Sequence, residues 1–582
     1  MASPKTGGLV TVVVKVDGSE LPGKFQLYSV DITKEINKIP WANIVFVDGS
    51  VQKQAFEINA EANLKPGKVV EVLAVFGTET PASIFKGIIT KLAARLKNGR
   101  SFTYIECKDK AIKMTLDRHN AVFVKKKDDA IIKAVTGNAG VTGKVDATTY
   151  EHPFIYQFDA TDWDFMRLRA EANGLIAIAN DNLVDVKEPA TAGEVVELNY
   201  GKDILELDIQ VDGRSQISAA KASAWNIQNQ SMTEIAGSAS ISETGDLTTD
   251  ALAGDFSLGT HCLNHAGTLN DAELTAWGKA QLLRHKWSKI TGKVQCHGFA
   301  GVKHGDTLKI GAISARYNGK LLVSGVSHNI INGNWTTTLQ IGLTPLSFAE
   351  SGIYNGQPAG GLLAPVYGLQ VGKVTKIIED PDSQERIELT LPAIDSAEKI
   401  WARKVYTYAG ATRGICFRPE VGDEVIVGFL HSDARFPVIL GSLYSSVAAP
   451  PLPAAEKNFE KGIFSKEGIK ILFNDEKKVL IIQTPGGQIV TLDDENKLIE
   501  LKDSNGNIIK TNDAGITIDS CKDVNINAKG KINLTTSAGD VTIKGVNVKN
   551  EASAKFEAKG NAGIDVNTSA ILTLKGSMTK IN

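Results

Sequence analysis

The sequence predicts a mainly β protein of three or four domains, and three observations support this fold class. Alternating strand-like segments fill most of the first 150 residues, and five short strands crowd into residues 366–444. Residues 524–582 then repeat an apolar pattern almost every eight residues. With 582 residues, the chain is also too long for a single hydrophobic core.

Composition favours none of several broad classes of protein, although it does not exclude a local charged patch. With 42% hydrophobic residues and a net charge of −2, the chain favours neither a nucleic-acid scaffold nor a membrane-surface binder. Five cysteines spread over the whole length do not suggest a disulfide framework and fit a reducing compartment. The segment "MASPKTGGLVTVVVKVDG" lacks a signal-peptide pattern, and no run of about eighteen apolar residues predicts a membrane-spanning helix. We therefore expect cytoplasmic synthesis and assembly, with any release left to another machine or to lysis.

Residues 1–355 are expected to form a first domain built from β-barrels. The segments 9–16, 25–32 and 69–76 are strand-like and are separated by Gly, Pro and Asp turns. The stretch 231–259 is rich in Ser, Thr, Gly and Ala and is predicted to be a loop.

Two helices with recognisable ends are predicted inside this domain. In "TDWDFMRLRAEANG", residues 161–174, Thr161 can cap the first turn and a glycine ends the helix. In "NDAELTAWGKAQLLRHKW", residues 270–287, Asn270 and Glu273 suit a capping box. Both segments carry apolar stripes at helical spacing, which predicts packing against the barrels.

Residues 366–446 are expected to form a separate small barrel. A stretch with Gly and Pro, residues 356–365, separates it from the first domain, and the proline-rich residues 447–457 follow it. Five strand-like segments of this length suit a closed barrel of the oligonucleotide/oligosaccharide-binding (OB) type.

From residue 460 to residue 582 the sequence is a ladder of short strands. Strand centres first recur about every nine or ten residues, between turns such as "DDENK" and "DSNGN", at Ile471, Ile481, Val490, Ile499, Ile508 and Ile518. The period then tightens to seven to nine residues, and each octad offers one short apolar face. The residues expected on that face are Val524, Ile526, Ile532, Leu534, Val541, Ile543, Phe556, Ile564, Val566, Leu572 and Leu574.

These octads are too short to enclose a core alone. Eight extended residues span about 26 Å at about 3.3 Å each, which is one side of a prism. A single-chain solenoid would need about 24 residues per coil, and residues 524–582 would supply fewer than the three coils usually required. If three identical chains each supply one side, every apolar face meets a shared axis and every strand finds a neighbour. We therefore predict an intertwined trimeric β-helix, or β-prism, with the shape of a needle.

Three stretches carry a resemblance to a known family. "RPEVGDEVIVGFLHSDARFPVILGSLYSS" (418–446) resembles the barrel signature of VgrG-type spike proteins of contractile injection systems. "GDTLKIGAISARYNGKLLVSGVSHNIINGNWTTTLQIG" (305–342) and "YQFDATDWDFMRLRAEANGLI" resemble the end and the helical region of their hub domain. The order of hub, small barrel and octad needle is also similar, and it covers essentially the whole chain.

The resemblance implies a function and a set of partners. It implies a homotrimeric spike and hub at the end of a tail tube, which adapts the six-fold tube to a three-fold needle and pierces a target membrane. The implied partners are the tail tube protein, baseplate proteins, a PAAR-repeat tip protein and, transiently, the target membrane. The chain has no histidine after His431, which disfavours a histidine-lined metal site in its own needle and favours a separate tip protein. Type VI secretion systems, extracellular injection particles and phage-derived tails all remain open.

No catalytic, cofactor-binding or metal-binding residues are predicted. Residues 444–462 leave no room for an enzymatic insert, and no nucleophile elbow, zinc helix or phosphate loop stands in a suitable context. Carboxylates such as Asp493 and Asp494 are predicted to be solvated turn residues. Needle lysines, including Lys529 and Lys531, are expected to keep exposed strands soluble and not to bind nucleic acid. One cluster has metal-ligand chemistry but lacks a paired zinc motif, so we predict a structural role for His261, Cys262, His265, His285, Cys296 and His297.

Two other classes of function stay open. A trimeric tail fibre that binds a receptor or glycan would also use β-prisms, and a polysaccharide-degrading solenoid enzyme would be monomeric. Neither accounts for the hub-like first 345 residues.

Overall fold

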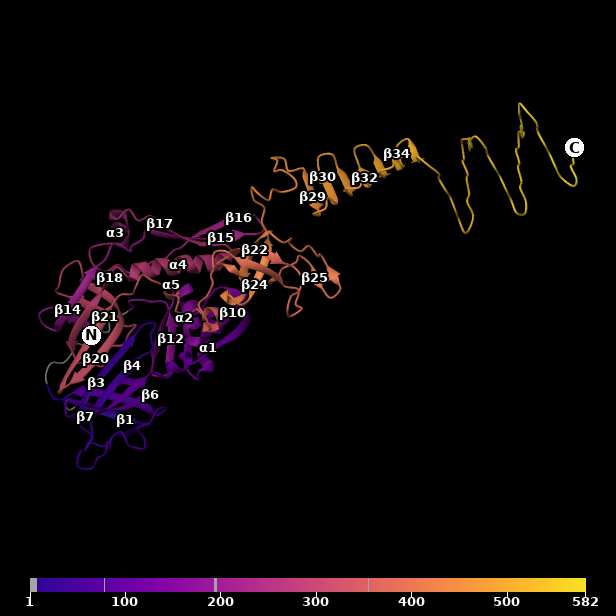
Figure 1. The fold of residues 1–582 in the computed structure, drawn as a ribbon. Helices are drawn as coiled ribbons and strands as arrows, with labels where there is room; N and C mark the ends of the chain where they lie inside the picture. Colours follow the sequence, from indigo (N-terminus) through magenta and orange to yellow (C-terminus); the bar gives the residue numbers. More distant parts are fainter. Residues whose placement is uncertain (1–7, 78, 193–195, 354, 582) are drawn as a thin grey trace. The chain divides into compact units, whose positions relative to one another are not determined.

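The computed structural model describes residues 8–77, 79–192, 196–353 and 355–581 (Figure 1). The start of the N-terminal segment, residues 1–7, lies outside this description. The chain divides into two compact units, Met1–Gln370 with Val427–Ile439 and Val371–Ile426 with Leu440–Asn582. No helix in the described part of the chain is long and apolar enough to cross a membrane.

A 13-stranded sheet forms the body of the first unit, in the order β14-β18-β21-β20-β3-β4-β7-β6-β5-β1-β2, with β13 and β19 attached beside β20. Its N-terminal half comprises β1 (Val10–Val16), β2 (Ser19–Glu20), β3 (Leu27–Glu35), β4 (Trp41–Val47), β5 (Val69–Phe76), β6 (Ala82–Lys97) and β7 (Arg100–Lys108). Its C-terminal half comprises β13 (Val196–Asn199), β14 (Ile204–Val211), β18 (Ile290–His297), β19 (Thr307–Gly311), β20 (Gly319–Ile331) and β21 (Asn334–Ile341). The two halves join where β20 pairs antiparallel with β3.

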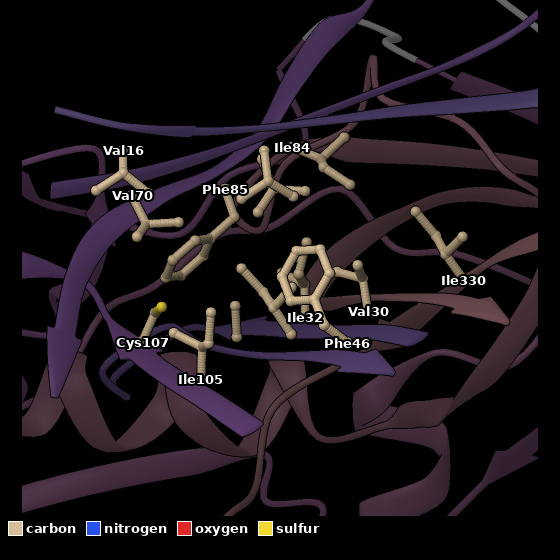
Figure 2. Packing of buried hydrophobic residues seen from close by; sticks show 14 of the residues in the cluster. Val16, Val30, Ile32, Phe46, Val70, Ile84, Phe85, Ile105, Cys107 and Ile330 are labelled. Carbon is tan, nitrogen blue, oxygen red and sulfur yellow. The ribbon is translucent and has the colours of Figure 1, made fainter. Parts of the chain in front are cut away.

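Two separate hydrophobic cores lie on this one sheet. The first gathers alternate residues of the N-terminal strands, such as Val30, Ile32 and Phe85, together with Trp335 of β21 (Figure 2 shows part of it). The second gathers residues of the C-terminal strands, including Val294, Leu308 and Leu339. Alternation along each strand, seen in the burial of β3 and β5, places one face in a core. The mainly β fold class is confirmed, and the two barrel-like halves share a single hydrogen-bonded sheet.

A first α/β insertion separates the two halves. It contains η1 (Lys110–Thr115), β8 (Arg118–Lys127), α1 (Asp128–Asn138), β9 (Thr142–Val145), β10 (Glu151–Thr161), α2 (Asp162–Ala172), β11 (Ile176–Asn180) and β12 (Leu183–Lys187). Helix α2 begins as predicted, because the Thr161 side chain accepts a hydrogen bond from the Asp164 amide, and Gly174 follows its end with φ +73°. The patterns above do not predict α1, whose buried Ile131, Ile132 and Val135 are β-branched residues more typical of strands.

A buried carboxylate ties α1 to α2. Asp128, 3% exposed, accepts hydrogen bonds from Arg169 Nε at 2.7 Å and Nη2 at 2.9 Å, and from Asn173 Nδ2 at 2.8 Å. The His152 ring nitrogen Nε2 lies 3.1 Å from the same carboxylate. Burial opposes ionisation of Asp128, yet the hydrogen bonds and charge of Arg169 hold its pKa below the usual value.

A second insertion overturns one prediction. It contains β15 (Ala219–Asn226), β16 (Ser231–Ala236), α3 (Thr249–Asp255), β17 (Thr260–His265) and α4 (Asp271–Trp287). The prediction of a loop across residues 231–259 is therefore wrong in two places, since β16 pairs with β15 and Thr248 caps α3. The small polar residues that suggested a loop instead pair as a strand and cap a helix. Helix α4 has the predicted capping box between Asn270 and Glu273.

The second part of the chain begins with a small barrel. After α5 (Phe348–Ser351) and η2 (Pro358–Gly361), a closed barrel forms in the order β22-β23-β24-β28-β27. The bounds of its elements are β22 (Gln370–Lys376), β23 (Ile387–Leu391), β24 (Asp395–Lys404), β25 (Ala409–Gly410), β26 (Arg413–Gly414), β27 (Glu424–Phe429), η3 (Leu430–Ser432) and β28 (Pro437–Ser442). Val374, Leu389 and Val425 fill its interior. The predicted five-stranded closed barrel is confirmed.

A seven-stranded antiparallel meander follows the proline-rich linker. Each strand pairs with the next along the chain, and the bounds are β29 (Glu460–Phe464), β30 (Lys470–Asn474), β31 (Val479–Gln483), β32 (Ile489–Asp493), β33 (Leu498–Lys502), β34 (Ile508–Asn512) and β35 (Gly515–Asp519). From residue 520 to residue 581 the chain runs back and forth without an assigned helix or strand (Figure 1, yellow).

Candidate trimerisation surface

Strand register places most, but not all, of the apolar residues of the meander on one face. Ile463, Ile471, Ile482, Val490, Leu501, Ile509 and Ile518 form an unbroken cross-strand row over all seven strands. A second row, two residues away on each strand, contains Lys461, Phe473, Leu480, Leu492, Ile499, Thr511 and Ile516. Side chains two apart share a face, so these rows make one apolar surface, which we call the meander face.

The opposite side of the meander becomes polar along the chain. Its central row reads Gly462, Leu472, Ile481, Thr491, Glu500, Lys510 and Thr517. Glu500 lies directly opposite Lys510, an arrangement that stabilises an exposed antiparallel pair. The flanking rows on this side still contain Phe464, Val479, Ile489, Leu498 and Ile508, so the meander face is the more apolar of two unequal sides.

The described part of a single chain leaves the meander face partly exposed. Leu492 is 40% exposed, Ile499 52% and Ile518 58%. An apolar sheet face of this length is larger than soluble monomers usually expose and marks an interaction surface.

Turn chemistry fixes the register that builds this face. In the turn after β33, the Asp503 carboxylate accepts hydrogen bonds from the amides of Asn505 at 2.9 Å and Asn507 at 2.8 Å. The side chains of Asn507 and Asn505 also donate to this carboxylate, and these bonds together lower the pKa of Asp503. Asp493 accepts from the Asn496 amide at 2.9 Å in the same way, so this carboxylate has the local turn role that the sequence predicted.

The predicted needle residues lie beyond the meander, and all of them are exposed. Their exposed fractions run from 53% for Ile532 to 70% for Leu574. Extended backbone without a paired neighbour leaves amide and carbonyl groups available to another chain. The structure thus places these residues in extended segments whose strand partners are not supplied by the same chain in its described part.

The histidines and cysteines do not converge on a metal site. His261 and Cys262 are successive residues of β17, so their side chains point to opposite faces. The His285 ring packs 5.8 Å from the His261 ring, and its Nδ1 contacts the Ser215 carbonyl. Cys296 is buried in β18, where burial raises its pKa to about 12. Among the described residues, no three His, Cys, Asp or Glu side chains are grouped closely enough to hold a metal ion.

Sequence periodicity alone places two of the six predicted strand centres on the wrong side of the meander. The first-row residues are spaced alternately 8 and 11 residues apart as far as Ile509, because consecutive antiparallel strands run in opposite directions. An average period of nine or ten residues mixes the two faces, and Ile481 and Ile508 in fact lie off the meander face. The alternating spacing of 8 and 11 residues is the sequence signal that could have identified the residues of the meander face.

Three family models match consecutive regions of the chain. The Alg8 N-terminal domain matches residues 6–332, the type VI secretion system/phage-baseplate injector OB domain matches residues 370–444, and the phage baseplate V C-terminal trimerisation domain matches residues 478–550. The second match covers the closed barrel, and the third covers most of the meander and the first octads.

Solved structures of phage tail and secretion proteins are partly similar to this chain, each with a TM-score below 0.5. The 43 kDa tail protein of prophage MuSo2 from Shewanella oneidensis is 12% identical over 58% of this chain and 98% of its own, with a TM-score of 0.43. The E. coli c3393 protein, a component of the type VI secretion system, is 13% identical over 74% of this chain and 99% of its own, with a TM-score of 0.38. A chain of the Francisella PdpA-VgrG complex is 10% identical over 88% of this chain and 80% of its own, with a TM-score of 0.36.

The injector OB-domain match and the trimerisation-domain match make residues 370–444 and 478–550 similar to parts of phage baseplates and of the type VI secretion system. Neither of these two family descriptions names a chemical reaction. Through the match that covers more than half of its length, the chain belongs to the family described as the Alg8 N-terminal domain.

Proposed function

We propose that the chain forms the homotrimeric central spike and hub at the end of a tail tube in a contractile injection system. The observation that carries this proposal is the meander face, a continuous apolar surface that leads into the unpaired octads and overlaps the match to a trimerisation domain. Three copies would bury this face around a shared axis and pair the octads between chains.

The mechanical role follows from rigidity. In a three-chain prism every strand has neighbours, so bending the needle would break inter-chain hydrogen bonds and expose apolar side chains. Contraction of a sheath would push the tube onto the hub, and the needle would concentrate that load on a small area of the target membrane. The hub would adapt the six-fold tube to the three-fold needle, and a separate PAAR-repeat protein would form the tip.

The proposal includes a location and partners. The chain would be made and assembled in the cytoplasm and leave the cell only as part of the particle. It would bind the tail tube protein on the hub and baseplate proteins around it, with no nucleic acid involved.

Light scattering of the purified full-length chain tests the trimer directly. We expect a mass near three times 62.3 kDa, and a fall or broadening of that mass when residues 524–582 are deleted. A monomeric full-length chain would contradict the spike and favour a single-chain solenoid. Co-purification with a PAAR-repeat protein, lost on the same deletion, tests the tip.

A further inference from the structure

A two-stranded ribbon on the hub carries a second exposed apolar surface. Strands β8 and β10 pair only with each other among the described strands, with Phe154 opposite Val124 and Tyr156 opposite Val122. These four side chains and Phe158 are 55% to 70% exposed, and we call them the ribbon face. The Phe154 and Tyr156 rings contact each other edge to face, with centroids 5.6 Å apart.

The ribbon face is not the side that folds the domain. The alternate residues Phe123 and Ile155 point to the other side and pack against the core of the first insertion. There the Phe123 ring stacks on Phe165 of α2 at 5.8 Å. The ribbon is therefore already anchored by one side, and its exposed aromatic side lies outside the core of the first insertion.

In a trimer, a neighbouring copy of the chain is available as the partner of the ribbon face. The trimerisation domain of the same chain would hold three hubs together, which raises the effective concentration of each hub for its neighbours to the millimolar range. The ribbon face has only five side chains, whereas an independent stable interface usually has roughly 20–30 residues on each side. A contact of this size suits copies that are already tethered to one another.

Charge and symmetry indicate what kind of surface on the neighbouring copy the ribbon face contacts. The end of the ribbon beside α1 carries the exposed Lys125, Lys126 and Lys127, so two ribbon faces would bring like charges together. Three-fold symmetry in any case joins two different surfaces of neighbouring copies. The neighbour's surface should therefore be apolar opposite the aromatic rings and acidic opposite the lysines.

We infer that the ribbon face packs against the hub or barrel surface of the next copy in the trimer. This inference rests on the trimeric state in the proposed function and adds a second inter-chain contact, far along the sequence from the trimerisation domain.

Photo-crosslinking in the full-length chain tests the contact. Tyr156 is replaced by p-benzoyl-phenylalanine, the protein is checked for trimeric mass, and irradiated samples are run on a denaturing gel. The control position is Val51, which is 92% exposed on the same unit. We expect an inter-chain band at least tenfold stronger from position 156 than from position 51. Adding Phe154→Glu should reduce this band several-fold, because it places charge in the apolar contact without touching the core.

The outcomes separate the two proposals. A monomeric mass contradicts the trimer itself and with it the proposed function. A trimer that gives no inter-chain band at position 156, or only links within one chain, overturns the ribbon contact and leaves the spike intact. An inter-chain band that Phe154→Glu leaves unchanged also overturns it, since the apolar face would not be what holds the copies together.

Discussion

The substitution Ile518→Asp tests whether the meander face is the shared core of the trimer. Ile518 lies in the first row of that face, opposite Ile509, and is 58% exposed in one chain. Its neighbour Thr517 points to the other side of the sheet, opposite Lys510. Thr517→Asp therefore adds the same charge one residue away, where it meets a cation and water.

The expected penalty is large because every change occurs three times. Full burial of an isoleucine side chain contributes about 1.5–3 kcal/mol, so burying the part of Ile518 that one chain leaves exposed contributes about 1–2 kcal/mol per copy. A carboxylate buried in its place costs several kcal/mol per copy even after local relaxation. Over three copies the loss is on the order of 10 kcal/mol, or about seven orders of magnitude in the association constant.

Light scattering and thermal unfolding measure the outcome. Ile518→Asp should be monomeric or heterogeneous, while Thr517→Asp should keep the mass and unfolding temperature of the unsubstituted trimer. Equal behaviour of the two variants, or a normal trimer from Ile518→Asp, would refute the assignment of the meander face to the trimer axis.

Three further predictions concern the needle and the hub. Ile564→Asp should abolish the assembled trimer, because it would bury three charges in one layer of the needle; a normal mass would show that the octad face is assigned wrongly. Asp128→Asn should destabilise the hub by about 3–5 kcal/mol in unfolding experiments, because it leaves Arg169 without its buried partner. Since the pKa of Asp128 is lowered on folding, the stability it contributes is present above its unfolded pKa and lost as pH falls below about 4, and Asp128→Asn should lose that part of the pH dependence. Thiol titration of the native chain at pH 8 should leave Cys107 and Cys296 unreactive, because burial raises the pKa of both thiols; rapid reaction of either would contradict its burial.

Local features of the fold could be predicted because their causes are local. The Thr161 cap of α2 and the capping box of α4 each depend on residues within one turn of the helix, and the structure contains both. The five barrel strands are bounded by turn residues that the sequence displays directly. Where residue types are ambiguous, local patterns failed: α1 is rich in β-branched residues, and β16 begins in a stretch typical of loops.

The sequence by itself predicted short apolar segments between turns over residues 460–582, each with too little apolar surface to fold alone, because period, turn residues and segment length are all properties of neighbouring positions. The structure assigns strands within residues 460–519 and none to residues 520–581. Only the tertiary structure decided which side chains act together. Phe473, Leu480 and Leu492 share a face because antiparallel register aligns residues from separate strands, and a shift of one residue would send each to the opposite side. The same holds for the ribbon face, where Val122 and Tyr156 meet although 34 positions separate them in the chain. Register is set by hydrogen bonds and packing between segments that are distant in the sequence, so it cannot be predicted from the sequence of one segment alone.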